Sequence, residues 1–548
     1  MPNRMALRWA TAGAIAGFDG DHKSKIETQV ISFGQFVDGL ERVANGLLKI
    51  GIEAGDRVIL FLPMSLEMYT AMFAIQRIGA IAVFLDSWAR RDHLGACASC
   101  VKPTAMISHA LAFELIDEVP EFDQMPIRII AGSGKNDSSQ VTLEELYKFD
   151  TGAPIAAVEP EETALVTFTT GSSGVPKGAN RTHRFLCAQH EALKAVLPYK
   201  ADDSDMPAFP IFSLNNLASG VTTIMPAIDL AHPDNTDSAV LVSQLLSESI
   251  SCTTLSPAML NGVASFCMAN HISIDSLHRV ITGGAPISKD NVRAFKLIAP
   301  NAEIWILYGS TEVEPMAHIE SKEMLALYED PDPEIIEEGV NVGKVDTKLR
   351  FKFIKPTADS IDFSRTNWDV LEMPKGSVGE FIVSGNHVCE GYYNNEEAFF
   401  KSKIRDNKGV IWHRTGDLAR IDGNGYLWIV GRIHNMIERA NQYFFPVSAE
   451  IILKRCPFVE RGAFLGFPDE KLGERTAVVI EFADSFNDVR NAIAEVLRLF
   501  DKNHILVDSF YVINTIPMDA RHHSKVEYNV LRDTIIENKF EDLLCARK

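Results

Sequence analysis

The stretch Thr167-Phe-Thr-Thr-Gly-Ser-Ser-Gly-Val-Pro-Lys-Gly178 combines small hydroxyl residues, three glycines and one lysine. Glycines let a backbone approach a ligand closely, and hydroxyl and N–H groups can surround phosphate oxygens. Lys177 lies between Pro176 and Gly178, whereas a Walker A loop ends in Gly-Lys-Ser/Thr, so the pattern predicts a different phosphate-binding loop. A flexible Gly/Ser linker has a similar composition. The apolar run at residues 163–168 predicts a strand before the stretch, which favours the loop over the linker.

The chain of 548 residues is too long for one compact core, which predicts at least two domains. Its contents of 46% hydrophobic and 23% charged residues are ordinary for a soluble globular protein. A net charge of -20 argues against a nucleic-acid partner, which a basic patch would indicate. The apolar stretch at residues 71–85 contains Gln76 and Arg77 and is too short and too polar to span a bilayer. We therefore expect a soluble, cytoplasmic protein; the pattern predicts no oligomeric state.

Eight cysteines are scattered through apolar or mixed contexts, which is typical of reduced core thiols. Cys97 and Cys100 form a lone CxxC, and the absence of a second pair at zinc spacing favours packing on a helix face over metal binding. The alanine- and glycine-rich residues 9–18 are interpreted as mature N-terminal structure and not as a signal peptide.

Helix-like and strand-like patterns alternate along the first half of the chain, which predicts parallel α/β units. The segment 209–217 is apolar without a clear period, and we expect it to be irregular. Short β-like runs at residues 339–395 predict a smaller β subdomain. The clearest predicted helices are 31–50, 65–78 and 182–196, and the clearest predicted strands are 56–62, 80–85, 126–131 and 163–168.

Two later strand-like runs end in small residues, namely Ile281-Thr-Gly-Gly-Ala-Pro286 and Ile304-Trp-Ile-Leu-Tyr-Gly-Ser-Thr-Glu312. In open parallel sheets, ligands bind beyond the carboxyl ends of strands, where such turns lie. The runs Trp412-His-Arg-Thr-Gly-Asp417 and Gly425-Tyr-Leu-Trp-Ile-Val-Gly-Arg432 follow. The residues after Arg432 are numerous enough to form a small domain of their own.

In this order the segments resemble the adenylate-forming superfamily of acyl-CoA synthetases, peptide-synthetase adenylation domains and luciferases, from about residue 31 to residue 525. The resemblance implies an α/β fold with a large N-terminal domain of stacked α/β units plus a small β subdomain, residues 1–432. It also implies a hinge at Ile433 and His434, followed by a small mobile α+β domain, residues 433–548, that carries Lys525. The implied reaction is ATP-dependent activation of a fatty-type carboxylic acid, with ATP and Mg²⁺ as cofactors and acyl-AMP and pyrophosphate as products.

The resemblance implies that the glycine-rich loop closes over the β- and γ-phosphates and that a second set of residues lines the adenine, with the ring of Tyr308 stacking on the base. Two further residues, Asp417 and Arg432, are implied to hold the ribose, because an ionised carboxylate offers two acceptor oxygens. The remaining implied ATP-binding residues are Thr169, Thr170, Gly171, Ser172, Ser173, Gly174, Lys177, Gly283, Gly284, Ala285, Pro286, Gly309 and Ser310.

Three residues are implied to act on the reacting groups. Thr311 donates to the α-phosphate, and Glu312 holds Mg²⁺, which prefers carboxylate and phosphate oxygens. Lys525 bridges the substrate carboxylate and the α-phosphate, where a cation stabilises the meeting of two anions.

Within the superfamily, the sequence is most similar to the β-lactone synthetases of bacterial olefin biosynthesis. The residues that carry this resemblance are Val175-Pro-Lys-Gly178, Phe209-Pro-Ile-Phe212, Tyr308-Gly-Ser-Thr-Glu-Val-Glu-Pro315, His413-Arg-Thr-Gly-Asp417 and Asp519-Ala-Arg-His522. It implies adenylation of a long-chain β-hydroxy acid, whose own hydroxyl then closes a lactone and expels AMP. Plausible walls for the acyl chain are residues 212–223 and the neighbourhood of Phe266 and Met268.

A fatty acyl-CoA ligase and a nucleotide-binding module without chemistry are the alternatives. CoA-forming members commonly read Ile-Lys-x-x-Gly where this chain has Ile437-Glu-Arg-Ala-Asn441, so a side chain and an anion stand in the path of CoA, and CoA as a cofactor stays uncertain. His522 is a speculative general base for the hydroxyl proton, because histidine titrates near neutral pH.

Overall fold

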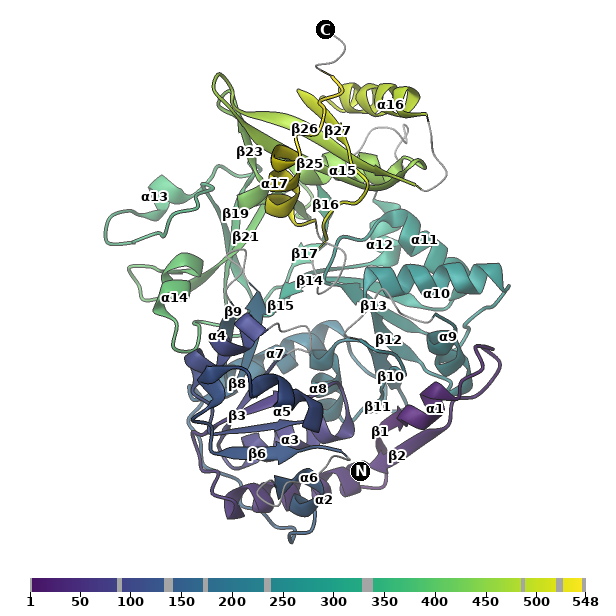
Figure 1. Cartoon of the computed structure of the whole chain (residues 1–548), viewed down its shortest axis with the longest axis vertical. Coiled ribbons are helices and arrows are strands. Elements are labelled where there is room, and N and C mark those ends of the chain that lie inside the picture. Colours follow the sequence, from purple (N-terminus) through teal and green to yellow (C-terminus); the bar gives the residue numbers. More distant parts are fainter. Residues whose placement is uncertain are drawn as a thin grey trace. The chain divides into compact units, whose positions relative to one another are not determined.

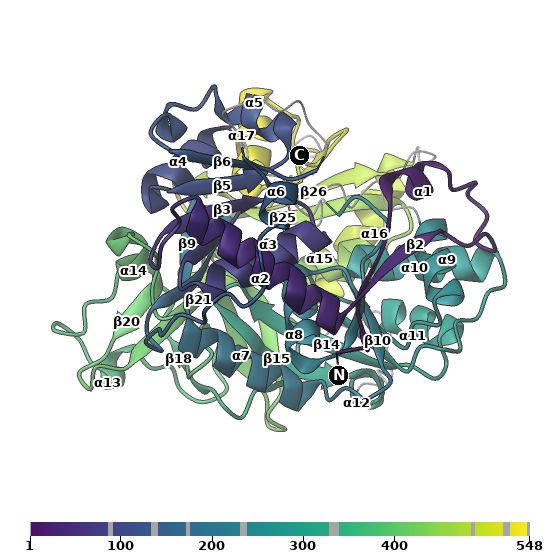
Figure 2. The same cartoon turned by 90° about the horizontal axis from the view of Figure 1, so that it is seen from below.

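The computed structural model describes residues 2–85, 91–132, 141–170, 176–230, 238–327, 339–483, 488–518 and 526–544, and its elements are shown in Figures 1 and 2. The chain forms two compact units, each described by itself below. Unit 1 comprises Met1–Gly284, Ser288–Met316 and Gly385–Lys403. Unit 2 comprises Ala285–Ile287, Ala317–Ser384 and Ile404–Lys548. The predicted domain boundary after Arg432 does not coincide with this division, and it stays a prediction.

Unit 1 contains a seven-stranded sheet that is parallel except for its last pair, β8 and β9. Its strands, in spatial order, are β7 (Val141–Thr142), β6 (Ile127–Ile130), β5 (Ala105–Ser108), β3 (Arg57–Phe61), β4 (Ile81–Phe84), β8 (Thr163–Thr170) and β9 (Pro176–Thr182). The helices of this part of the chain are α2 (Phe33–Lys49), α3 (Leu66–Arg77), α4 (Arg91–Val101), α5 (Ala110–Ile116), α6 (Leu143–Leu146) and α7 (His183–Val196).

Alternation along β3 shows how helices cover both faces of this sheet. Val58 and Leu60 pack in one hydrophobic cluster with α2 and α3, whereas Ile59 packs in another with α4 and α5. Successive side chains of a strand point to opposite faces, so the two clusters lie on opposite sides. Figure 2 shows α2 and α3 running side by side. The parallel α/β units predicted from the sequence are thereby confirmed.

A second sheet of unit 1 is built mainly of parallel strands, with β2 antiparallel to β1. Its order is β15 (Val313–Glu320), β14 (Glu303–Ser310), β13 (Arg279–Gly283), β12 (Cys252–Leu255), β10 (Ser204–Pro207), β11 (Thr222–Ile224), β1 (Met5–Ala10) and β2 (Thr28–Ser32). The helices of this region are α1 (Ala12–Ala16), α8 (Pro210–Ser219), α9 (Ser238–Ser247), α10 (Pro257–Ala269), α11 (Lys289–Ile298) and, near the end of the unit, α14 (Glu396–Ser402).

Helix α8 contradicts the expectation that residues 209–217 are irregular. Pro210 occupies the first helical turn, where a missing N–H costs nothing, and Gly220 ends the helix in the left-handed conformation with φ 71°. The helix is largely buried, so its apolar residues show no one-sided period. For the same reason the sequence pattern could not reveal it.

Unit 2 contains a mainly antiparallel sheet in the region where the sequence predicted a β subdomain. Its strands are β16 (Val340–Asn341), β22 (Leu427–Arg432), β21 (Ile411–Ile421), β19 (Gly379–Ser384) and β18 (Arg350–Ile354), with β20 (Lys403–Arg405) beside β21. Strand β17 (Lys344–Val345) pairs with the second half of β15, and the short helices are α12 (Ser321–Ala326) and α13 (Trp368–Leu371).

The last part of unit 2 has a five-stranded sheet with helices on both faces. Val478 and Ile480 of its long strand β26 pack with α15 and α16, while Ala477 and Val479 pack with α17. The strands are β24 (Gln442–Phe444), β23 (Ile437–Arg439), β26 (Gly473–Phe482), β25 (Val459–Asp469) and β27 (Ser509–Val512), and the helices are α15 (Pro446–Arg455), α16 (Val489–Lys502) and α17 (Tyr528–Glu537).

Within the described ranges, every helix is too short or too polar to cross a bilayer. Cys97 of the predicted CxxC is buried in the cluster between the first sheet and α4, and the Cys100 thiol donates to the carbonyl of Tyr393 at 3.0 Å. These contacts agree with a packing role for the pair.

Candidate functional site

The predicted phosphate-binding stretch lies at the end of an antiparallel hairpin. Thr169 of β8 pairs with Lys177 of β9, and Thr170 pairs with Pro176, so both flanks of the turn are fixed in register. Gly178 lies inside β9, where a Cβ atom would come within 2.8 Å of Cγ1 of Val166; the glycine makes room for the strand pair. The remaining predicted loop residues, Gly171, Ser172, Ser173 and Gly174, lie outside the described residues.

The predicted residues Thr311 and Glu312 form the turn between β14 and β15, and three donors hold this turn in place. The Arg181 guanidinium donates to the carbonyl of Thr311 at 2.7 Å. The backbone N–H of Cys389 donates to the carbonyl of Glu312 at 2.8 Å, and the Tyr392 hydroxyl donates to Oε1 of Glu312 at 2.8 Å. The Glu312 carboxylate is therefore oriented by residues more than 70 positions further along the chain.

Two lysines flank the ring of Tyr392. The ammonium group of Lys177 lies 5.9 Å from the ring centre, and that of the fully buried Lys403 lies 5.4 Å from it and donates to the carbonyl of Cys389. Burial lowers the pKa of both lysines, and the negative charge of Glu312 opposes that shift in each case. The carboxylate thus helps both lysines to stay charged.

The predicted adenine-side residues Gly283 and Tyr308 lie at the carboxyl ends of the adjacent parallel strands β13 and β14. A Cβ atom on Gly283 would lie 2.4 Å from the carbonyl oxygen of Leu307, so this close approach of two backbones requires glycine. Gly284 follows with φ +81°, a conformation that disfavours other residues. Gly309 and Ser310 continue β14 towards the Thr311–Glu312 turn, while Ala285 and Pro286 are assigned to unit 2.

Asp417 and Arg432 face each other across the strand pair β21–β22 of unit 2. The Arg432 guanidinium Nε lies 2.7 Å from Oδ1 of Asp417, whose side chain is buried while that of Arg432 is 48% exposed. The backbone N–H of Asp417 donates to the Thr415 hydroxyl at 3.0 Å. Asp417 therefore lies in a strand interior, with its carboxylate held by a partner that water can reach.

The predicted hinge residues Ile433 and His434 form one turn of 3₁₀ helix directly after β22. Further on, Ala440 and Asn441 connect β23 and β24 with φ 49° and 63°. Two consecutive left-handed residues form the turn type that suits a two-residue hairpin, and asparagine tolerates this conformation better than most residues. Asn441 thus keeps the backbone that a glycine would allow and adds an exposed side chain. Lys525 and His522 lie outside the described residues.

The two predicted walls of an acyl site differ in their surroundings. Phe212 of α8 is buried against Ile281 and Leu307 of strands β13 and β14. Phe266 of α10 contacts the ring of His22 at its edge, and Met268 is 43% exposed. Only the neighbourhood of Phe212 lies under the strand ends that carry Gly283 and Tyr308.

Sequence reasoning missed four residues of unit 1 that shape this region: Arg181, Glu314, Tyr392 and Lys403. Arg181, Tyr392 and Lys403 contact backbone carbonyls or residues distant in sequence, so no local motif marks them. Glu314 lies within the run Tyr308–Pro315 that carries the family resemblance, but no role was assigned to it. The sole signal was position, because Arg181 follows Lys177 by four residues along the same strand and Glu314 follows Glu312 by two.

A model of the family described as AMP-binding enzyme matches residues 11–393. An olefin β-lactone synthetase of Xanthomonas campestris pv. campestris is 27% identical over 510 residues, which cover 90% of this chain and 89% of that protein. The 4-coumarate–CoA ligase CCL1 of Humulus lupulus is 24% identical, with 93% of this chain and 89% of that protein covered. The sequence is therefore similar both to an enzyme named as a β-lactone synthetase and to one named as a CoA ligase.

Among solved structures, the chain is similar to an o-succinylbenzoate coenzyme A synthetase from Bacillus subtilis in complex with ATP and magnesium ion. The TM-score is 0.74 at 17% identity, and 97% of each chain is covered. The fold of this chain is thus the mixed α/β architecture expected from the sequence, with a large N-terminal and a smaller C-terminal part.

The Glu314 carboxyl makes a testable contribution to pH-dependent stability. Burial raises its pKa to about 7, and the charge of Arg181 opposes this shift only in part. Because the folded state holds this proton after the unfolded state has lost it, stability falls as pH rises from about 4.5 to about 7. We expect Glu314→Gln to remove at most about 3 kcal/mol of this dependence, seen as a smaller difference between thermal midpoints at about pH 5 and about pH 8.

Glu303→Gln, at the exposed start of β14, is the matched control and should leave the pH dependence as it is. Buried Glu450 and Asp205, whose pKa values burial also raises, to about 7 and about 6, contribute pH dependence of the same sign in the wild type and in both variants. An unchanged pH dependence in Glu314→Gln would show that the carboxyl is solvated in the folded protein.

Proposed function

Because the chain belongs to the AMP-binding enzyme family, we propose that it activates a carboxylic acid with ATP, forming an acyl adenylate and releasing pyrophosphate. The observation that carries the proposal is the Thr311–Glu312 turn. It places a hydroxyl and an oriented carboxylate beyond the carboxyl ends of parallel strands, where ligands of α/β sheets bind. The charge of Glu312 acts on Lys177, which stands beside the hairpin turn proposed to hold phosphates.

The residues at this turn fit Mg²⁺. Glu312 supplies carboxylate oxygens, which this hard cation prefers, and the hydrogen bond from Tyr392 fixes their direction. The bound ion would supply charge neutralisation for the phosphates. We assign the remaining roles as follows: Lys177 binds the β- and γ-phosphates, Thr311 donates to the α-phosphate, and Asp417 and Arg432 hold the ribose.

Lys525 is assigned to the chemical step. The carboxylate oxygen of the acid attacks the α-phosphorus and displaces pyrophosphate, so two anions meet in the transition state. A lysine that touches both groups there lowers the barrier more than it stabilises the separated reactants. The positive charge of Lys525 would also stabilise the phosphate of the bound acyl adenylate.

For the second step we propose closure of a β-lactone from a long-chain β-hydroxyacyl adenylate. The substrate's own hydroxyl oxygen attacks the acyl carbon, the bond to the AMP phosphate breaks, and the hydroxyl proton leaves to a base. Intramolecular attack has an entropic advantage that offsets part of the strain of the ring. The similarity to an olefin β-lactone synthetase over nearly the whole chain supports this step.

Asn441 and Glu438 support an acceptor other than CoA. Asn441 adds a side chain at the left-handed position of the β23–β24 turn, and Glu438 is an exposed anion in β23. An anionic cofactor is repelled by the second residue and hindered by the first. A CoA ligase is the second candidate, because a 4-coumarate–CoA ligase also covers most of the chain.

Product analysis separates the two steps. Incubation with ATP, Mg²⁺ and a β-hydroxy fatty acid labelled with ¹⁸O in its carboxylate should give labelled AMP, pyrophosphate and the β-lactone, with or without CoA. Label in AMP with a thioester as the sole acyl product would refute lactone closure and leave adenylation standing. Binding of ATP with neither pyrophosphate nor label transfer would refute adenylation itself, as expected for a module without chemistry.

The hydrogen bond from Tyr392 to Glu312 gives a second prediction. Tyr392→Phe removes the donor that orients the carboxylate, so the Mg²⁺ concentration for half-maximal pyrophosphate release should rise about tenfold or more. At saturating Mg²⁺ the rate should recover most of its value. Tyr393→Phe, which leaves this hydrogen bond intact, is the matched control. Equal Mg²⁺ dependence in both variants would mean that Glu312 needs no help from Tyr392.

Substitutions in the β23–β24 turn test whether CoA can serve as the acyl acceptor. If the Asn441 side chain obstructs CoA, Asn441→Gly should raise thioester formation by something on the order of tenfold, without changing pyrophosphate release. The control is Ala440→Gly, because residue 440 also has a positive φ and lies next to Asn441. Thioester formation that stays at the wild-type level in Asn441→Gly would assign the choice of acceptor to other residues.

A further inference from the structure

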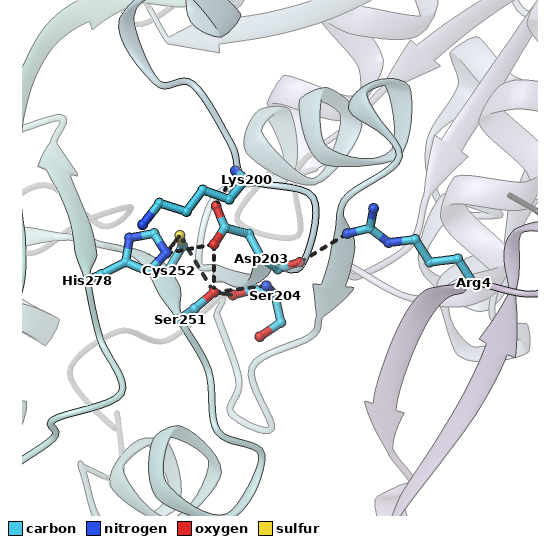
Figure 3. Close-up of polar contacts among 7 residues, drawn as sticks. All are labelled: Arg4, Lys200, Asp203, Ser204, Ser251, Cys252 and His278. Atoms are coloured by element: carbon cyan, nitrogen blue, oxygen red, sulfur yellow. Dashed lines mark hydrogen bonds and ion pairs between the residues drawn. The ribbon is translucent and has the colours of Figure 1, made fainter.

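Three side chains from neighbouring parallel strands of unit 1 converge at the amino ends of those strands (Figure 3). Asp203 directly precedes β10, Cys252 begins β12, and His278 directly precedes β13. Gly283, on the side proposed for the nucleotide, ends β13 at its other end. The cluster of Asp203, Cys252 and His278 is thus separate from the proposed active site.

The potential ligand atoms of the cluster face one another. Nε2 of His278 lies 2.6 Å from Oδ1 of Asp203 and 3.9 Å from Sγ of Cys252. All three atoms lie within 4.8 Å of one another. The same imidazole nitrogen therefore faces both the carboxylate and the sulfur.

This arrangement differs from a nucleophilic triad. In a Cys–His–Asp triad, one imidazole nitrogen takes the proton of the thiol while the other donates to the carboxylate. Here a single nitrogen faces both groups, so it cannot serve as a relay between them. A salt bridge accounts for His278 and Asp203 but gives no reason for the buried thiol beside them. Three potential ligand atoms within 4.8 Å of one another are compatible with binding of a metal ion.

We propose that Asp203, Cys252 and His278 form a binding site for a divalent transition-metal ion of the zinc type. A carboxylate, a thiolate and an imidazole are all ligands that zinc accepts, and three protein ligands leave a fourth position for water. In a tetrahedral zinc site the nitrogen and oxygen ligands lie about 3.3 Å apart, and nitrogen and sulfur about 3.6 Å apart. The observed N–O separation of 2.6 Å is shorter than in such a site and the N–S separation of 3.9 Å is longer, so the His278 and Asp203 side chains must move apart to admit an ion between them.

Hydrogen bonds from neighbouring groups already hold the Asp203 carboxylate in position. The backbone N–H of Lys200 donates to Oδ2 at 2.7 Å, which directs Oδ1 towards His278 and Cys252. The hydroxyl of Ser251 lies 3.3 Å from Oδ1 and 3.9 Å from Sγ of Cys252. In metal sites, hydrogen bonds of this kind to a ligating side chain fix its orientation towards the ion. Asp203 and Cys252 are buried, while the His278 side chain is 28% exposed and offers a path for entry.

Charge also suits a divalent ion. The Asp203 carboxylate and a Cys252 thiolate together balance two positive charges. Among the described residues, three cations stand near the cluster. Arg4 donates to the backbone carbonyl of Asp203, and the Lys200 side chain lies beside His278 in Figure 3. Arg279 packs over the ring of Tyr199, and its charge acts on the buried carboxylate of Asp205 as well as on Asp203. An ion bound here would join three neighbouring strands of the sheet, so we expect it to stabilise unit 1.

Cobalt(II) is a suitable probe, because a tetrahedral site with a thiolate ligand gives visible bands and a sulfur-to-cobalt charge-transfer band. The full chain, stripped with a chelator, should bind about one cobalt per chain and show this band, and zinc should abolish it. Cys252→Ser should lose the charge-transfer band. Zinc should raise the thermal midpoint of the wild type and have less effect on His278→Gln, whose affinity should fall about tenfold or more.

Matched controls are two other free cysteines of unit 1. Cys267→Ser removes another buried thiol, and Cys187→Ser removes an exposed one; both should keep the band. A band that persists in Cys252→Ser or vanishes in Cys187→Ser would overturn the proposal, as would a wild type that binds no cobalt. If Cys252→Ser does not fold, the partly exposed His278→Gln decides: unchanged cobalt affinity would overturn the site.

Discussion

The proposed active site of unit 1 depends on the attraction between two buried cations and one carboxylate. Arg181 and Lys403 are buried, and burial alone favours their neutral forms. The negative charge of Glu312 acts on both of them, and it also acts on Lys177. Removing this one charge would leave three cations close together with little water around two of them. The position of Glu312 therefore bears on the charge of these cations as well as on the proposed metal binding, and contacts from the surrounding chain maintain it.

That arrangement explains why unit 1 includes Gly385–Lys403, a segment whose sequence neighbours on both sides belong to unit 2. The segment supplies the N–H of Cys389, the hydroxyl of Tyr392 and the ammonium group of Lys403 to the Thr311–Glu312 turn and its surroundings. An isolated β14–β15 turn would have no such donors. The chain thus returns to the first unit to complete the polar contacts of a turn that the β strands alone could not hold.

The sequence was a good guide wherever local periodicity and glycine motifs dominate. It predicted the α/β units, the strand before the glycine-rich loop, and the strand ends that carry Gly283, Tyr308 and Glu312. It was wrong about α8, because a largely buried helix shows no clear apolar stripe. It missed Arg181, Tyr392 and Lys403, because long-range hydrogen bonds leave no mark in local sequence. For Cys252 the sequence predicted a core thiol like the other cysteines, because Asp203 and His278 become its neighbours only when the parallel strands align.

The contact of Gly283 with the Leu307 carbonyl has a consequence for the evolution and engineering of this enzyme. Any side chain at residue 283 would push apart two strands that also position Tyr308 and the Thr311–Glu312 turn, so a substitution there would disturb the sheet and the proposed nucleotide site together. A library of variants at residue 283 would therefore consist mostly of destabilised proteins. Phe212, which packs under the same strand ends from a helix, is surrounded by apolar side chains, so a substitution of similar volume can be accommodated by repacking of those side chains. Substitutions that alter the interior of this region are therefore better tolerated on the helix side than at the strand ends.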